Sequence, residues 1–251
     1  MSTINRTQLI ATLRQALENN PAVCAAWEGG SAAFTYMDDL SDVDAVVVVE
    51  DDAVDAVFDA VEAALAALSP IDLRHDITGA VGYQQRFYRL RDASPFLVVD
   101  LVLLRRGDPL LFREVELHGK GTTWLDRYNL LNTKHLDAQA DLAQAKARLP
   151  ALRSAFDMFQ HIPTKERLRG RAVEALSFYH AMTLRPLVEA LRIRHCPHLR
   201  NFGLRYLDRD LPADVVARIR ELMFVSDLDD LERKHALAQA WFWETAGKMD
   251  Q

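Results

Sequence analysis

Two aspartates, Asp42 and Asp44, begin an apolar run that ends in four consecutive valines at residues 46–49. A run of β-branched residues of this length is typical of a strand that is buried on both faces of a sheet. Because side chains two residues apart on a strand point to the same face, Asp42 and Asp44 are expected to lie side by side. The sequence therefore predicts a pair of carboxylates at the start of a central strand in an α/β fold.

A glycine-rich turn, Gly29-Gly30-Ser31, precedes this strand. Glycine lets the backbone approach a ligand closely, and backbone N–H groups and a hydroxyl are the donors that a polyphosphate needs. Carboxylate oxygens suit Mg²⁺, which usually binds through one or two carboxylates together with substrate phosphates. The turn and the aspartates together indicate a phosphate site beside a metal site.

A third aspartate, Asp100, lies within the apolar run at residues 96–104. A single charge among apolar residues is costly to bury unless it is paired or bound to a metal. Residues 84–90 and 96–104 are predicted to form a β-hairpin around the polar turn between them. Asp100 is then in mid-strand, and it reaches the two earlier aspartates if their strands are neighbours.

The order of these features resembles the DNA polymerase β-like nucleotidyltransferase superfamily, in which Gly-Ser, a spacer, Asp-x-Asp and a strand precede a third carboxylate on a later strand. The resemblance implies an α/β (α+β) domain with a mixed sheet flanked by helices. It implies transfer of a nucleoside monophosphate from an NTP to a hydroxyl, with two Mg²⁺ ions as cofactors. The implied ligands of the metal are Asp42, Asp44 and Asp100, which are also the catalytic residues. The implied nucleotide-binding residues are Gly29, Gly30 and Ser31.

The resemblance leaves two details of the site open. Many members of the family carry a further small or basic pattern directly after the Gly-Ser, where this sequence has Ala32, Ala33 and Phe34. The contacts to the triphosphate are therefore not fixed by the resemblance. In some small-molecule members a carboxylate acts as general base for the acceptor hydroxyl, and here Asp100 and Glu174 are both candidates.

The chain is expected to have two domains, a nucleotidyltransferase domain at residues 1–118 and an all-α substrate or partner domain at residues 119–251. Strand signals stop after residue 109, and the periodicity of the remaining chain is helical. In the first domain, the predicted helices are 9–17 and 54–68, and the predicted strands are 22–27, 43–50, 84–90 and 96–104. In the second domain, the predicted helices are 133–147, 151–160, 165–194 with a break at Pro186, 212–224 and 229–246.

Charge is distributed unevenly along the chain. Residues 38–76 contain twelve acidic residues and one basic residue, whereas residues 163–220 contain twelve Lys and Arg and six acidic residues. The basic segment either neutralises the acidic one or helps to grip phosphates or an anionic acceptor, and the sequence leaves both readings open. The formal net charge of −6 argues against a nucleic-acid binder, whose footprint is basic.

Membrane insertion and secretion are not indicated by the sequence. No apolar run approaches the roughly 20 residues of a membrane span, and the N-terminus has no apolar signal core. Two cysteines make no disulfide framework, so a cytoplasmic protein is expected. The cluster Trp241-Phe242-Trp243 is interpreted either as an anchor of the last helix or as a contact in an oligomer.

These observations favour a Mg²⁺-dependent nucleotidyltransferase that transfers a nucleoside monophosphate, AMP from ATP by expectation, to a hydroxylated small molecule. The two-domain architecture is similar to the antibiotic nucleotidyltransferases of aminoglycoside or lincosamide type. One alternative is a regulatory or antitoxin-like protein that keeps the fold and acts on or binds a protein partner. Another alternative, addition to the end of tRNA or a polynucleotide, needs a basic channel, and the net charge counts against it.

Overall fold

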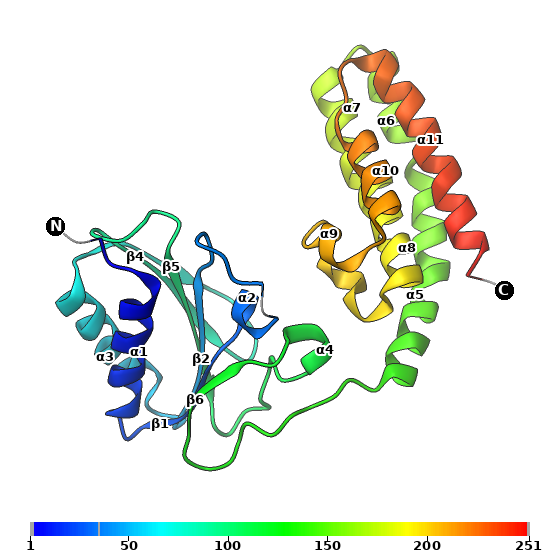
Figure 1. Cartoon of the computed structure of the whole chain (residues 1–251). Helices are drawn as coiled ribbons and strands as arrows, with labels where there is room; N and C mark the ends of the chain where they lie inside the picture. Colours follow the sequence, from blue (N-terminus) through cyan, green and yellow to red (C-terminus); the bar gives the residue numbers. More distant parts are fainter. Residues whose placement is uncertain (1–2, 35, 250–251) are drawn as a thin grey trace. The chain divides into compact units, whose positions relative to one another are not determined.

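The computed structural model describes residues 3–34 and 36–249. The chain divides into two compact units, Met1–Leu136 and Asp137–Gln251 (Figure 1). The first unit is built on a β-sheet and the second consists of helices. The predicted fold class, a mixed sheet with flanking helices followed by an all-α region, is therefore confirmed. Within the described residues, no helix is both long enough and apolar enough to cross a membrane.

Six strands form the sheet of the first unit, in the order β3-β4-β5-β2-β1-β6. The central strands β2 and β5 are parallel, and the other neighbouring strands are antiparallel. The predicted hairpin of β4 and β5 is present. The strands are β1 (Val23–Glu28), β2 (Val43–Val49), β3 (Ile71–Ile77), β4 (Gln84–Leu90), β5 (Val98–Arg105) and β6 (Thr122–Asp126).

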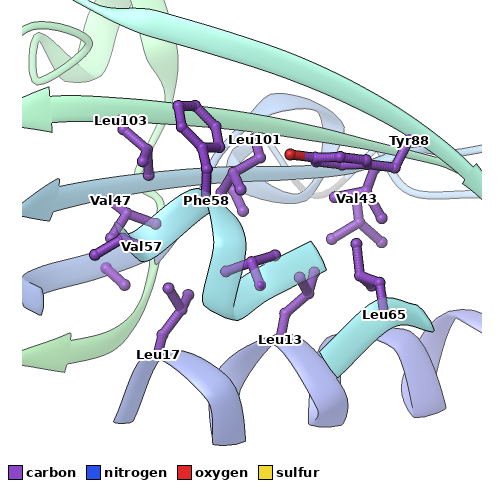
Figure 2. Packing of buried hydrophobic residues seen from close by; sticks show 14 of the residues in the cluster. Leu13, Leu17, Val43, Val47, Val57, Phe58, Leu65, Tyr88, Leu101 and Leu103 are labelled. Carbon is purple, nitrogen blue, oxygen red and sulfur yellow. The ribbon is translucent and has the colours of Figure 1, made fainter. Parts of the chain in front are cut away.

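Two helices, α1 (Arg6–Glu18) and α3 (Val54–Leu68), cover one face of the sheet. Asn5 begins α1 with a capping box, in which Asn5 and Gln8 each accept the other's backbone N–H. Apolar residues at helical spacing on both helices pack against alternate residues of the central strands (Figure 2). The labelled members of this core are Leu13, Leu17, Val43, Val47, Val57, Phe58, Leu65, Tyr88, Leu101 and Leu103.

The opposite face of the sheet has a smaller buried core, against which partly buried residues of the segments 110–112 and 130–131 pack. Its buried members are Cys24, Ala25, Trp27, Val46, Val48, Val102 and Leu104. Because strand side chains alternate, Asp44 projects from the same face as Val46, and Asp100 projects from the same face as Val102. Each of the two aspartates therefore lies at the end of a row of apolar side chains on this face of the sheet.

Two strands that the sequence analysis did not predict lie at the edges of the sheet. β3 has an exposed and largely polar sequence, and an ion pair of 2.6 Å joins its residues Arg74 and Asp76. β6 is short and pairs with β1. An edge strand forms by pairing with its neighbour and carries polar residues on its free side, so it lacks the continuous apolar run of a central strand.

The first compact unit extends to Leu136, beyond the boundary predicted at residue 118. A boundary at 118 falls at the end of the short helix α4 (Val115–His118) and separates β6 from the strand with which it pairs. It also cuts a close contact, because the Lys120 N–H donates to the carbonyl of Ala33 (3.0 Å). The apolar runs that mark the domain in the sequence end earlier than the sheet does.

The second unit is helical throughout its described residues. The predicted helices 133–147 and 151–160 form one helix, which accommodates Pro150. The predicted helix 165–194 is divided by Gly170, which has a φ of +71°, and by a π-helical turn, His180–Leu184. The helices are α5 (Ala138–Phe159), α6 (His161–Leu168), α7 (Ala172–Tyr179), α8 (Arg185–His195), α9 (Leu207–Asp210), α10 (Ala213–Met223) and α11 (Leu228–Gly247).

Aromatic side chains attach α11 to the rest of the helical unit. Phe242 is fully buried and stacks on Phe156 of α5, with 3.6 Å between the ring centroids. Trp241 is also buried, and the guanidinium of Arg218 lies 4.1 Å from the centre of its ring. Trp243 contacts Phe156 edge-on and is partly exposed. These contacts support the interpretation of the aromatic cluster as an anchor of the last helix.

Candidate functional site

Asp44 and Asp100 lie directly opposite each other on the parallel strands β2 and β5. Neighbouring strands are about 4.8 Å apart, so the two carboxylates project together from one face of the sheet. The sequence analysis required the two strands to be neighbours for Asp100 to reach the other aspartates, and the pairing of β2 with β5 meets that condition. A close pair of carboxylates in the middle of the sheet is the centre of the candidate site.

Both carboxyl groups hold a proton more tightly than an exposed aspartate does. Burial, and then the negative charges of Asp100, Asp42 and Glu28, raise the pKa of Asp44 to about 6. Burial also raises the pKa of Asp100, although its hydrogen bond from a glutamine acts in the opposite direction. Arg6 is the cation that lowers the pKa of Asp44, but it is itself paired with Glu28. A bound cation would therefore relieve the repulsion between the two aspartates.

The glycine turn after β1 packs closely against Asp44. Gly29 donates its N–H to the carbonyl of Asp44 (2.9 Å), and Gly30 begins the short helix α2 (Gly30–Ala33) with a φ of +56°. A Cβ at position 30 would lie 1.7 Å from Oδ2 of Asp44. Glycine is thus required here both by the backbone conformation and by the contact. The turn predicted to bind phosphate, which continues into Ser31 of α2, lies beside the carboxylate pair.

Gly30→Ala is expected to lower the free energy of unfolding by roughly 2–4 kcal/mol, because the positive φ is strained and the methyl group displaces the Asp44 carboxylate. Gly79→Ala is the matched control, since Gly79 has a φ of +82° but an added Cβ there meets nothing within 4 Å. Urea denaturation of both variants measures the difference. An equal loss of unfolding free energy in the two variants would show that the contact of position 30 with Asp44 does not contribute to stability.

Asp42 lies just outside the strand, as the predicted strand 43–50 implied, and its place beside Asp44 stays a prediction. β2 begins at Val43, and Asp42 is exposed just before it. Oδ1 of Asp42 accepts the backbone N–H of Val98 (3.1 Å) at the start of β5, so this carboxylate joins the beginnings of the two central strands. Its charge still raises the pKa of both Asp44 and Asp100.

The donors of the carboxylate pair fit one Mg²⁺ ion. In the part of the chain that the structure describes, no group of three or more His, Cys, Asp or Glu side chains is arranged to hold a metal. Asp44 and Asp100 offer two carboxylates, and Mg²⁺ is commonly bound in this way when phosphates and water complete its ligand shell. A second ion that also uses Asp42 stays a prediction, because that carboxylate accepts the Val98 N–H in this structure.

Three residues that the sequence analysis did not single out belong to the surroundings of the pair. Gln85 of β4 donates from Nε2 to Oδ1 of Asp100 (2.7 Å) and so fixes the orientation of this carboxylate. Glu28, the last residue of β1, is buried and paired with Arg6, which also donates to the carbonyl of Asp42 (3.3 Å). Glu28 had a signal in the sequence, as an acidic residue directly before the glycine turn. Gln85 is recognised only once the pairing of β4 with β5 is known.

The second candidate for the general base, Glu174, lies on α7 of the helical unit and is exposed. The basic stretch before it forms ion pairs within the same unit, including Arg167 with Glu232 (2.6 Å) and Arg171 with Glu166 (3.2 Å). Glu166 is buried, so its pair with Arg171 belongs to the packing of the helical unit rather than to an open surface. These ion pairs account for part of the positive charge that the sequence analysis noted at residues 163–220.

Comparison with known proteins finds structural similarity to nucleotidyltransferases at low sequence identity. An aminoglycoside 6-adenyltransferase from Bacillus subtilis matches 97% of this chain and 89% of its own, at 12% identity and a TM-score of 0.40. A nucleotidyltransferase-like protein from Exiguobacterium sibiricum matches 96% of this chain and 74% of its own, at 14% identity and a TM-score of 0.39. No protein-family model and no curated protein matches the chain. Similarity at this level carries no argument about the activity of this chain.

Proposed function

We propose that this protein is a Mg²⁺-dependent nucleotidyltransferase, which transfers AMP from ATP to the hydroxyl of a small molecule and releases pyrophosphate. The proposal rests on one observation, the carboxylate pair Asp44–Asp100 directly beside the Gly29-Gly30 turn. Two half-buried carboxylates that repel each other, next to a glycine turn with backbone N–H donors, suit a divalent cation carrying a polyphosphate.

Each residue of the site has a role in the proposed reaction. Asp44 and Asp100 would hold Mg²⁺, with Asp42 as a third ligand if its carboxylate leaves the Val98 N–H. Mg²⁺ held there would supply charge neutralisation for the phosphates in an in-line displacement at the α-phosphorus. The glycine turn leaves room for the β- and γ-phosphates beside Asp44, and Ser31 adds a hydroxyl donor. Gln85 keeps the carboxylate of Asp100 aimed at the site through its hydrogen bond of 2.7 Å.

Asp100 is the residue that we favour as general base for the acceptor hydroxyl. Its carboxylate lies beside Asp44, and burial raises its pKa above that of an ordinary aspartate, which makes it a stronger base. Glu174 has no comparable surroundings, because it is exposed on a helix surface. Aminoglycosides and lincosamides belong in the acceptor pool, since the architecture expected from the sequence is similar to that of enzymes which modify them.

Release of pyrophosphate tests this proposal. Each NTP is incubated with Mg²⁺ and pooled hydroxylated acceptors, and an Asp44→Asn/Asp100→Asn double variant serves as the blank. We expect release that depends on both the acceptor and Mg²⁺ and that is absent from the double variant. Equal release by the wild type and the double variant, or none with any pool, would contradict the assignment as an enzyme.

The arrangement of Asp42 gives a binding-only function some support. If Asp42 keeps its bond to the Val98 N–H, the site has two carboxylates, which suit the binding of Mg²⁺ together with a nucleotide. A regulatory or antitoxin-like protein that recognises a protein partner would have such a site. Mg·ATP binding by calorimetry, together with absent pyrophosphate release, is the result that would favour this second function.

Binding of Mg²⁺ is expected to weaken as the pH falls through about 6. The pKa of Asp44 is raised to about 6, and a carboxylate ligand must lose its proton to bind the metal. Below this pH the apparent Kd should rise about tenfold per pH unit, whereas an ordinary exposed aspartate shows this only below about pH 4. Calorimetric titration of Mg²⁺ across this range measures the midpoint. A midpoint near pH 4 would mean that Asp44 is not a ligand.

A further inference from the structure

A pocket lies within the helical unit, between α5, the beginning of α8 and the 3₁₀-helical segment Pro197–Phe202. Its volume is about 640 Å³, which is within the range of small-molecule sites in proteins. Five of its nine lining residues are polar or charged, and three of these five are arginines. The lining includes Arg148, Arg185, Glu189, Arg200, Asn201 and Leu204.

Two of the three arginines are held in place by carboxylates. Arg148 donates from Nε and a terminal nitrogen to the two carboxylate oxygens of Glu189 (2.6 and 3.2 Å). Arg200 donates to Asp141 (2.5 Å) and to the side chain of Gln144 (3.2 Å). A guanidinium has five N–H donors, so each arginine keeps donors for a ligand after making these bonds. The ion pairs therefore orient the two arginines without using all of their donors.

The third arginine, Arg185, has no such partner. It is the first residue of α8 and is exposed, and among the residues that the structure describes no carboxylate forms an ion pair with it. Since Glu189 is the single acidic residue of the lining, the wall carries an excess of positive charge. An anion in the pocket would meet a charge that the protein itself leaves uncompensated.

The wall of the pocket is built from irregular backbone that buried contacts hold rigid. The π-helical turn His180–Leu184 leads into α8, and turns of this kind are frequent at functional sites. Gly203 has a φ of +58°, and an added Cβ there would meet open space. Arg192, which is completely buried, donates from Nε to the carbonyl of Gly203 (2.8 Å). This hydrogen bond ties the Gly203 segment of the wall to α8.

We propose that this pocket binds a small molecule that carries a phosphate or carboxylate group, with Arg185 as its main contact and Arg148 and Arg200 as further donors. The flat fork of a guanidinium matches the two oxygens of either group. The concave shape and limited volume suit a small ligand rather than a polynucleotide. The proposal is independent of nucleotidyl transfer, because every lining residue belongs to the helical unit.

Calorimetry on the full-length protein without divalent cations tests the proposal, with pyrophosphate and citrate as the two probes. We expect at least one of them to bind with a Kd below about 1 mM, and Arg185→Gln to weaken binding at least about tenfold, the value of one bidentate charged contact. Binding of pyrophosphate alone assigns a phosphate ligand, and binding of citrate alone assigns a carboxylate ligand. Failure of the wild type to bind either probe would overturn the proposal.

Two further variants separate the pocket from other sources of anion binding. Arg194→Gln removes an exposed arginine of the same helix that does not line the pocket, and it should leave binding unchanged. Asp44→Asn alters the candidate nucleotide site in the other unit and should also leave binding unchanged. An equal loss in Arg194→Gln would show non-specific attraction. Tighter binding in Asp44→Asn would place the anion at the nucleotide site instead, because without a metal the Asp44 carboxylate repels an anion there, and either result would overturn the proposal.

Discussion

Asp44→Asn is expected to lower the rate of nucleotidyl transfer by on the order of 10³-fold or more, because stabilisation by a bound metal amounts to several kcal/mol. The substitution keeps the size of the side chain and removes its charge. It therefore removes a ligand of the proposed metal without disturbing the contact with Gly30. Single-turnover measurement of AMP transfer at saturating Mg·ATP separates this loss from weakened nucleotide binding.

The same substitution is expected to stabilise the protein. The pKa of Asp44 is raised from its ordinary value of 3.8 to about 6 in the folded state, so the folded protein binds this proton more tightly than the unfolded chain does. Ionisation of Asp44 consequently costs roughly 2–3 kcal/mol of folding free energy above pH 6. Asp44→Asn should recover most of this energy at neutral pH. The gain should shrink as the pH falls through 6 and vanish below 3.8.

Denaturation with urea in the presence of EDTA, at several pH values, measures this gain. Asp59→Asn is the matched control, since it removes the same charge from an exposed position on α3. The control should change the free energy of unfolding by less than about 0.5 kcal/mol. A variant that loses both activity and stability would show that Asp44 has a structural role, whereas lost activity with increased stability is the expected signature of a strained functional carboxylate.

Arg192→Met is expected to destabilise the helical unit by roughly 3–5 kcal/mol, because it breaks a buried ion pair by removing one partner. The side chain of Arg192 is inaccessible to solvent and pairs with the buried Asp210 (2.9 Å). It also donates to the carbonyls of Gly203 (2.8 Å) and Arg205. Methionine fills the volume but supplies none of these donors. Arg209 also pairs with Asp210 and will offset part of the loss (2.6 Å).

Thermal and urea denaturation measure this effect, with Arg194→Met as the matched control on the exposed side of the same helix. The control should cost less than about 0.5 kcal/mol. Arg192→Lys should recover little of the stability, since an ammonium group cannot reproduce the planar fork that reaches a carboxylate and two carbonyls together. A loss below about 1 kcal/mol in Arg192→Met would mean that Arg209 and the backbone satisfy Asp210 without Arg192.

The central part of the sheet could be predicted because its strands carry strong local signals. β2 and β5 are apolar on both faces, and they are interrupted only by Asp44 and Asp100. The edge strands β3 and β6 could not be found in this way, because an edge strand is held by hydrogen bonds to its neighbour and its exposed residues are polar. The same difference explains why the first unit extends beyond the boundary predicted at residue 118.

In the helical unit, several ends of helices could not be predicted from the local sequence. Pro150 was expected to end a helix but lies within α5. The region 165–194, for which a break was expected at Pro186, is divided at Gly170 and at the π-helical turn directly before α8, and Pro186 lies in the first turn of α8. Proline tolerates the conformation of a helix if one lost hydrogen bond is offset by packing, and α5 buries Leu149 and Leu152 on either side of it. Packing, which is not local, decides such cases.

The sequence by itself determined the class of the fold, the identity of the acidic residues and the glycine turn that accompanies them. These features depend on local chemistry: strand alternation, the cost of a charge in an apolar run and the conformational freedom of glycine. Only the tertiary structure decided that Asp44 faces Asp100 while Asp42 accepts the Val98 N–H, and that Arg185 lines a pocket with no ion pair to any residue that the structure describes. The register of the strands and the walls of the pocket bring together residues that are far apart in the chain. A pattern in the sequence contains no information about the distances between such residues.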